Sequence, residues 1–358
     1  MKKNDLWRTP LELVSCYRSA IMGAAALMIL LYHCWIKQNL QLWILPLVEA
    51  RLVALGFIGV EMFLFLSGMG LTSAIDKYDS IWTFYAKRIR RMAPAYLFAV
   101  LLYTWRRGHG IKEYLMLATG YVHVTESITA LLWYVPAAMI LYAVFPLYHR
   151  FLTRAKHETV FTLNCIGVWM LLTLAFQDAV RSDLWVFLNR VPVFLLGVLA
   201  GRLRRTRQVT FSGAHWFGVV IAFVLGFEMT RMAAIGKITL FPEAVYSLEA
   251  AMMGIALVLL LALLCWLMEA CAGLAGRALR LCVAALSQIG RFSLELYCIH
   301  QWLNGEIYRC LDGRMSTLMI NAVTILCNLL AAWLLLGAQN ALLKGIDNAA
   351  GAVRKKAS

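Results

Sequence analysis

Residues 245–270 read VYSLEAAMMGIALVLLLALLCWLMEA and are apolar almost throughout. A helix that crosses a bilayer needs about 20 mostly apolar residues, so this stretch is long enough to span a membrane. Stretches of the same kind cover 19–36, 52–75, 88–105, 131–149, 159–177, 185–201, 211–230, 283–303 and 316–338. The sequence therefore predicts an all-α, polytopic transmembrane helix bundle with about ten spans.

The overall composition supports a membrane protein. Hydrophobic residues make up 62% of the chain and charged residues only 15%, whereas a soluble domain has about 25% charged residues. The net charge of +15 is typical of basic cytoplasmic loops in so apolar a chain, and we expect no nucleic-acid partner. The nine cysteines are scattered without C-x-x-C or histidines at metal spacing, so we expect neither a disulfide framework nor a metal site.

The distribution of Lys and Arg predicts the topology. The stretch 113–124 (EYLMLATGYVHV) is too short and too polar to cross, and we interpret it as re-entrant or interfacial. Both termini then lie on one side, together with the basic clusters 87–91 and 202–207. Cytoplasmic loops carry an excess of basic residues, so we expect a multi-pass protein of the cell membrane with both termini cytoplasmic. One membrane domain fills residues 1–358, with a cytoplasmic N-terminus (1–18) and a basic tail (344–358).

Several predicted spans contain ionisable residues, which at membrane depth usually face a bundle interior or a cavity. Structural alternatives stay open for most of them. Arg291 and Glu295, four residues apart, can neutralise each other, and Arg190 can cap a carbonyl that the following proline frees. The ionisable residues are His33, Glu61, Arg190, Arg291, Glu295 and His300.

His33 and Glu61 form the first candidate site. His33 lies fifteen residues beyond Arg18, or about 22 Å along a helix, which places it in the outer third of the membrane. Glu61 falls in the outer half of the next span. A histidine and a carboxylate at similar depth can act as a base and its orienting partner, and we predict this pairing.

The cluster KRIRR, residues 87–91, is the second candidate site. Arg88 and Arg91 are three residues apart and share a helix face, Lys87 lies beside Arg91, and Pro94 can bend the helix. The cluster can be a plain positive-inside anchor that contacts membrane lipid. It can also bind phosphates, which arginine holds with two hydrogen bonds. We predict that this phosphate site and His33 share one passage through the helices.

Five stretches resemble a known family: YRSAIMGAAALMILLYH, LGFIGVEMFLFLSGMGL, FYAKRIRRMAPAY, LWYVPAAMILYAVFPLY and IGRFSLELYCIH. Over nearly its whole length the chain is similar to the acyltransferase-3 family of multi-span membrane acyltransferases. The resemblance places a functional histidine on His33, an acidic residue on Glu61 and a phosphate-binding R-x-x-R segment on Arg88 and Arg91. The motif that carries Glu61 also places a Ser-Gly pair on Ser67 and Gly68, and the weaker later motifs fall on Trp133, Ser293, Tyr297 and His300.

The resemblance implies acyl transfer from cytosolic acyl-CoA, by analogy acetyl-CoA, to a hydroxyl of a cell-surface glycan or a similar small-molecule acceptor. His33 would deprotonate this hydroxyl or carry the acyl group itself. Ser67 would serve helix packing more readily than nucleophilic attack. Ser293, Tyr297 and His300 would form a polar stripe on the acceptor side.

One position departs from the family pattern. The family often has a basic residue eleven positions before the histidine, where this chain has Met22. Arg18 lies one turn further down and about 60° around the helix, so its role stays open. A transporter or flippase of a small polar molecule is the alternative function, and a scaffold is a third. The sequence indicates no oligomeric state.

Overall fold

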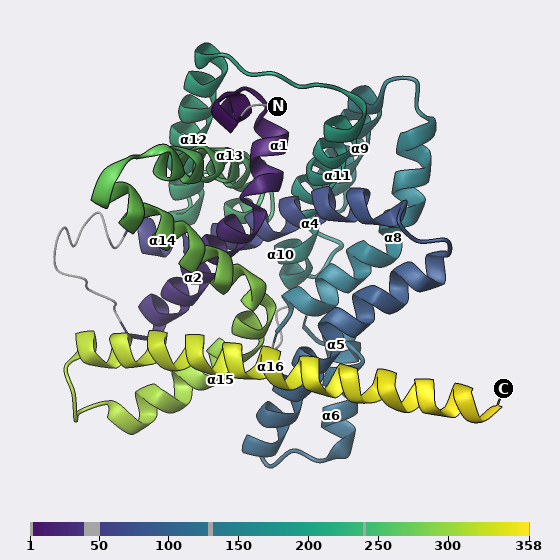
Figure 1. Cartoon of the computed structure of the whole chain (residues 1–358), viewed down its shortest axis with the longest axis vertical. Helices are drawn as coiled ribbons and strands as arrows, with labels where there is room; N and C mark the ends of the chain where they lie inside the picture. The colour runs from purple at the N-terminus through teal and green to yellow at the C-terminus, as the bar shows by residue number, and fades with distance from the viewer. Residues whose placement is uncertain (1–2, 39–50, 128–131, 239–240, 358) are drawn as a thin grey trace.

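The computed structural model describes residues 3–38, 51–127, 132–238 and 241–357, and these residues form helices without a strand (Figure 1). The all-α prediction is confirmed. Residues 1–2 and 358, at the ends of the two predicted cytoplasmic termini, lie outside the described residues. The first half of the chain forms η1 (Lys3–Arg8), α1 (Pro10–Cys16), α2 (Arg18–Gln38), η2 (Gly56–Ile58), α4 (Gly59–Ile75), α5 (Ile81–Arg106), α6 (Ile111–Ala118), α7 (Tyr121–Thr125), α8 (Tyr134–Arg154) and α9 (Glu158–Phe176). The second half forms η3 (Ser182–Leu184), α10 (Trp185–Leu188), α11 (Val191–Thr206), α12 (Gly213–Ala234), η4 (Ala244–Tyr246), α13 (Leu248–Ala270), α14 (Gly273–Arg291), α15 (Ser293–Leu311) and α16 (Thr317–Ala357).

Seven helical segments among the described residues are long and apolar enough to cross a membrane. The bent pair α1 and α2, with 72° between its halves, makes an eighth if it is counted as one span. The predicted span 88–105 in α5 does not qualify, because Arg88, Arg90 and Arg91 leave too short an apolar stretch. The seven segments are Gly56–Ile75, Tyr134–Arg154, Glu158–Phe176, Ser182–Thr206, Gly213–Ala234, Ala244–Ala270 and Thr317–Ala349.

The predicted span 283–303 is not one helix. α14 ends at Arg291 and α15 begins at Ser293. The Ser293 hydroxyl donates to the Gly290 carbonyl oxygen at 3.0 Å, and Gly290 packs directly on the backbone of Ser19 in α2. The prediction of a continuous span is therefore wrong here. The stretch 113–124, by contrast, forms the short helices α6 and α7, neither of which is long enough to cross.

α4 lies in the middle of the molecule, with α11 and α2 packed against it (Figure 1). Glycines permit the close approach of α4 and α11. A Cβ atom on Gly201 would lie 2.7 Å from the Met69 carbonyl oxygen, and one on Gly68 would lie 2.6 Å from the Phe194 carbonyl oxygen. Such small residues are typical of helix interfaces in membranes. The packing role expected for the Ser67–Gly68 pair therefore applies to Gly68.

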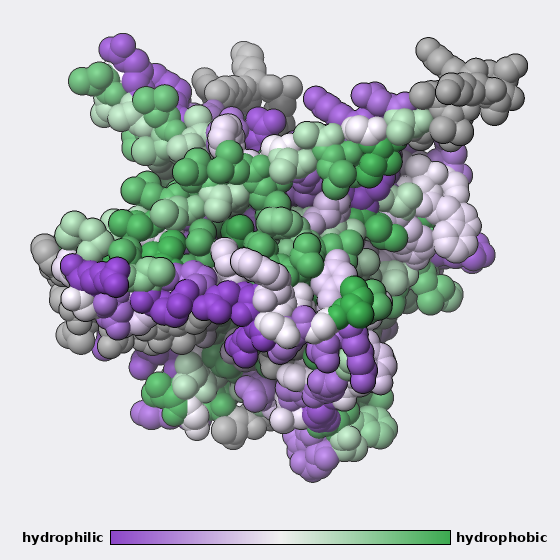
Figure 2. Space-filling model, turned by 90° about the horizontal axis from the view of Figure 1, so that it is seen from below, coloured by the Kyte–Doolittle hydropathy of each residue, from purple (hydrophilic) through white to green (hydrophobic). Residues whose placement is uncertain are grey.

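The surface of the bundle is rich in hydrophobic side chains. Leu171 is 69% exposed, Leu326 67% and Trp105 72%. Figure 2 shows hydrophobic residues gathered in broad areas over one face, with hydrophilic residues grouped beside them. Water would disfavour apolar areas of this extent, whereas lipid chains cover them without cost. The protein is therefore a membrane protein.

Candidate functional site

A cavity of about 360 Å³ lies between α2, α4, α5, α8, α14 and α15, and we call it the arginine cavity. It contains most of the residues that the sequence singled out, although these residues are spread over the whole chain. Its lining is Arg18, Ser19, Met22, Ile29, Val60, Phe63, Ser67, Arg88, Arg91, Met92, Tyr134, Tyr142, Gly290, Arg291, Ser293, Leu294 and Tyr297.

Arg18 and Arg88 bring positive charge into this cavity, and neither forms an ion pair within the described residues. Arg18 lies against Gly70, where an added Cβ would be 3.0 Å from its Nη2 atom. Arg88 donates to the Tyr78 hydroxyl at 3.4 Å and lies over the ring of Phe84. The Nε atoms of both arginines are buried without a hydrogen-bond partner. Both side chains are half-buried and have no carboxylate partner in the described part of the chain, so this pair is suited to an anionic ligand that enters the cavity.

Arg91 is compensated. Its Nη2 atom donates to Glu295 Oε2 at 3.0 Å, and Glu295 is fully buried. The alternative in which Arg291 and Glu295 neutralise each other is therefore wrong. Arg291 ends α14, and its guanidinium donates to Gln288 Oε1 at 3.3 Å instead.

Lys87 does not join the arginines. It is exposed and does not line the cavity, because α5 turns Phe84, Arg88 and Arg91 inward and leaves Lys87 on its outer side. Arg18 is instead the cation that lines the cavity together with Arg88 and Arg91. Met22, at the position where the family pattern has its basic residue, lines the same cavity one turn further along α2. The long side chain of Arg18 thus reaches the same cavity as Met22.

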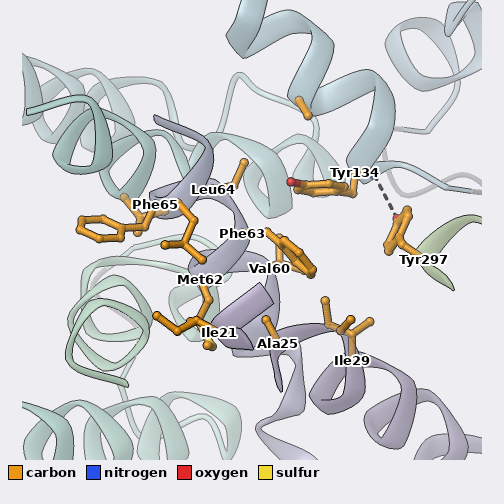
Figure 3. Packing of buried hydrophobic residues seen from close by; sticks show 14 of the residues in the cluster. Ile21, Ala25, Ile29, Val60, Met62, Phe63, Leu64, Phe65, Tyr134 and Tyr297 are labelled. Carbon is orange, nitrogen blue, oxygen red and sulfur yellow. Dashed lines mark hydrogen bonds between the residues drawn. The ribbon is translucent and has the colours of Figure 1, made fainter. Parts of the chain in front are cut away.

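The cavity ends at four side chains from four helices: Ile29, Phe63, Tyr134 and Tyr297. Figure 3 shows these residues gathered at one place, with the Tyr134 backbone N–H donating to the Tyr297 hydroxyl at 3.2 Å. The two tyrosine rings meet edge to face at 5.3 Å between centroids. His33 does not line the cavity. The predicted passage shared by the arginines and His33 is therefore interrupted by one layer of side chains.

His33 and His300 lie directly behind this layer. The two imidazole rings are 4.6 Å apart, and the His300 ring is 5.7 Å from the Tyr297 ring. His300 Nδ1 lies 2.8 Å from the Tyr297 carbonyl oxygen and 3.2 Å from the Leu296 carbonyl oxygen. Carbonyl oxygens only accept hydrogen bonds, so His300 Nδ1 carries a proton. In the neutral ring, His300 Nε2 is then an acceptor.

The same reasoning fixes the tautomer of His33. Its Nδ1 atom lies 3.1 Å from His300 Nε2 and 2.8 Å from the Ile29 carbonyl oxygen. When the His300 ring is neutral, both of these atoms are acceptors, and His33 Nδ1 then carries the proton. The Gln301 amide donates to His33 Nε2 at 3.2 Å. The lone pair of His33 is therefore on Nε2 and faces Gln301.

Glu61 does not orient His33. Its Oε1 atom lies 2.7 Å from Arg190 Nε, and both side chains are almost fully buried. The Arg190 guanidinium lies 5.0 Å from the Trp133 ring centroid and 4.2 Å from that of Tyr246. The predicted pairing of His33 with Glu61 is therefore wrong. Glu61 forms an ion pair with Arg190, and the Trp133 ring packs on the Arg190 guanidinium. Arg190 also donates to the Val186 carbonyl oxygen. The carbonyl four residues before Pro192 is that of Leu188, and it accepts from Trp169 Nε1 at 3.1 Å, so the predicted cap by Arg190 is wrong.

The remaining candidates lie on the cavity wall. Ser67 accepts a hydrogen bond from the Tyr142 hydroxyl at 3.2 Å. Ser293 and Tyr297 line the cavity, whereas His300, one turn beyond, contacts His33. The predicted stripe on α15 therefore runs from the arginine cavity to the imidazole. Gln301, which follows His300, was missed by sequence reasoning although it adjoins a motif residue.

Comparison with known proteins identifies one family. A family model described as an acyltransferase domain matches residues 22–337, which include both histidines and the lining of the arginine cavity except Arg18 and Ser19. Searches of curated proteins and of solved structures found no match.

Proposed function

This chain belongs to the acyltransferase-3 family, and we propose that it transfers an acyl group, acetyl by analogy, from acyl-CoA to a hydroxyl of a cell-surface glycan or a similar acceptor. The observation that carries the proposal is the pair Arg18 and Arg88, which place uncompensated positive charge in a cavity that ends one side-chain layer from His33. An acyl-CoA molecule has phosphates at one end and the thioester at the other. Its phosphates would therefore lie at the arginines and its thioester at the end of the cavity nearest His33.

The donor phosphates would bind to Arg18, Arg88 and Arg91. Guanidinium groups hold phosphate oxygens with paired, charge-assisted hydrogen bonds. Glu295 already accepts two hydrogen bonds from Arg91, so it would keep the Arg91 guanidinium directed at the cavity wall. The apolar far end, formed by Ile29, Phe63 and the two tyrosines, would receive the thioester end of the donor.

His33 would act as the general base. As Nε2 takes the proton of the acceptor hydroxyl, the hydroxyl oxygen attacks the thioester carbonyl carbon. The intermediate then breaks its C–S bond, and the leaving thiolate takes the proton from His33. One ester and one free thiol result. His300 would hold the productive tautomer of His33 in the place first predicted for Glu61.

The arrangement also requires a movement. The contact between Tyr134 and Tyr297 separates the arginine cavity from His33, so this contact would open when the donor binds. We place the arginine cavity on the cytoplasmic side of the cell membrane, because the chain's basic clusters favour cytoplasmic termini.

Mass spectrometry of envelope glycans tests this function in cells. The glycans should carry an added acyl mass when the wild-type protein is present and lose it with Arg88→Lys/Arg91→Lys, because lysine lacks the paired donors of arginine. The matched control is Arg90→Lys, since Arg90 belongs to the same cluster but pairs with Asp347 outside the cavity. Equal acylation by the double variant and the control would rule out the phosphate site.

A further inference from the structure

A second cavity, of about 310 Å³, lies at the opposite ends of α5 and α15. We call it the Gln301 pocket. Arg91 in the arginine cavity and Arg106 in this pocket are fifteen residues apart on α5, or about 22 Å along the helix. The lining residues are Tyr103, Arg106, Arg107, Gln301, Trp302, Gly305 and Glu306.

Gln301 connects this pocket to the base. Its side chain lines the pocket, and its amide donates to His33 Nε2 at 3.2 Å. Tyr297, four residues earlier on α15, lines the arginine cavity. One turn of α15 therefore separates the two cavities, and His300 and His33 lie between them. The lone pair of His33 is directed toward the Gln301 side.

The chemistry of the pocket suits a neutral molecule with several hydroxyl groups. Arg106 Nε donates to Glu306 Oε1 at 2.9 Å, so these two charges compensate each other. Hydrogen bonds from Arg309 and Arg106 lower the pKa of Glu306, which therefore stays an acceptor at neutral pH. Trp302 Nε1 is a buried donor without a hydrogen-bond partner. Aromatic rings beside paired donors and acceptors are well matched to a sugar ring.

We propose that the Gln301 pocket is the acceptor site, that it takes a sugar ring or a similar polyol, and that the Gln301 amide occupies the place of the reacting hydroxyl until the acceptor binds. This inference rests on the proposed acyl transfer. The acceptor O–H would replace the Gln301 N–H at His33 Nε2. The released amide could then donate to the acceptor oxygen or to the thioester carbonyl.

The test uses full-length protein in lipid nanodiscs, radiolabelled acetyl-CoA as donor and isolated envelope glycan as acceptor. Trp302→Phe keeps an aromatic ring and removes the Nε1 donor. We expect about a three- to tenfold higher glycan concentration at half-maximal transfer, the effect of one lost hydrogen bond. The control Trp105→Phe makes the same change at an exposed residue of α5 outside the pocket and should match wild type.

Coenzyme A affinity separates the two proposals. It should be unchanged in Trp302→Phe, because the arginine cavity is intact. Half-maximal glycan concentrations that equal wild type would overturn the acceptor site, and so would a parallel loss of coenzyme A affinity. If Trp302→Phe does not fold, Arg107→Ala replaces it, because Arg107 is an exposed residue of the same pocket and should raise the same concentration. A wild-type protein that binds coenzyme A but acylates no glycan would contradict the proposed function itself.

Discussion

The arginine cavity and the Gln301 pocket are both lined by arginines, but they differ in how that charge is compensated. Arg18 and Arg88 have no acidic partner within the described residues, whereas Arg106 is paired with Glu306. Two guanidinium groups without a carboxylate in one cavity fit phosphates. In the Gln301 pocket Arg106 has a carboxylate partner and only the exposed Arg107 has none within the described residues, which fits hydroxyl groups better. The difference indicates which end would bind the donor and which the acceptor.

A third arginine extends the comparison. Arg190 is only 2% exposed, and it has both a carboxylate partner and two aromatic neighbours. No cavity reaches it among those described. The charge of Arg190 is therefore compensated inside the protein, whereas Arg18 and Arg88 face a cavity that a ligand can enter.

The largest expected effect is at the boundary between the two cavities. His33→Ala should lower the rate of acyl transfer by at least about 100-fold, because general base catalysis contributes on the order of 10²–10⁴. Coenzyme A affinity should stay unchanged, and the exposed histidine variant His157→Ala should transfer at the wild-type rate. Transfer by His33→Ala at more than a tenth of the wild-type rate would exclude His33 as the base.

Removing a charge partner where no ligand can enter should destabilise the fold. Glu61→Gln leaves Arg190 uncompensated in the interior, which typically costs about 3–5 kcal/mol. Asp347→Asn, which breaks the exposed pair with Arg90, should cost at most about 1 kcal/mol. Thermal unfolding in detergent measures both.

A second variant separates stability from catalysis. Glu61→Leu/Arg190→Met removes both charges and should recover much of the lost stability, because no unpaired charge remains. If Glu61→Gln instead melts like wild type and transfers nothing, Glu61 would act in catalysis and the corrected assignment would fail.

The smallest effect concerns pH and the paired charges of the Gln301 pocket. The folded pKa of Glu306 lies below its ordinary value of about 4.3 because Arg309 and Arg106 donate to the carboxylate. The contribution of these ion pairs to stability is therefore fully present above the ordinary pKa of about 4.3 and is lost as the pH falls through the lowered pKa of Glu306. Because Glu306 stays ionised from pH 7 to pH 5, it should not change the glycan concentration at half-maximal transfer over this interval. Glu306→Gln should resemble the acidic form at every pH, and a variant indistinguishable from wild type would remove Glu306 from the acceptor site.

The sequence predicts which residues of one helix share a face better than it predicts their partners on other helices. Helical spacing within α5 placed Arg88 and Arg91 on one face, and the structure agrees. The partner of His33, however, lies 267 residues away on α15, a distance over which spacing carries no information. Depth alone favoured Glu61, but Arg190 at a similar depth was the stronger competitor for a carboxylate.

The break between two helices was also not predicted from the sequence. Residues 283–303 are apolar enough to resemble one span, yet one helix ends at Arg291 and the next begins at Ser293, close to where Gly290 packs on the backbone of α2. This break separates Arg291 from Glu295 and leaves Glu295 to Arg91. The role of Arg18 could not be predicted because its angle around the helix does not include the reach of its long side chain. Tertiary packing decided each case.

A structure of the protein with bound coenzyme A tests the central claim most directly. We expect phosphate density within hydrogen-bonding distance of the Arg18 and Arg88 guanidinium groups, with the thiol end directed toward Tyr297. Phosphate density elsewhere on the molecule, with both guanidinium groups still unpaired, would contradict it.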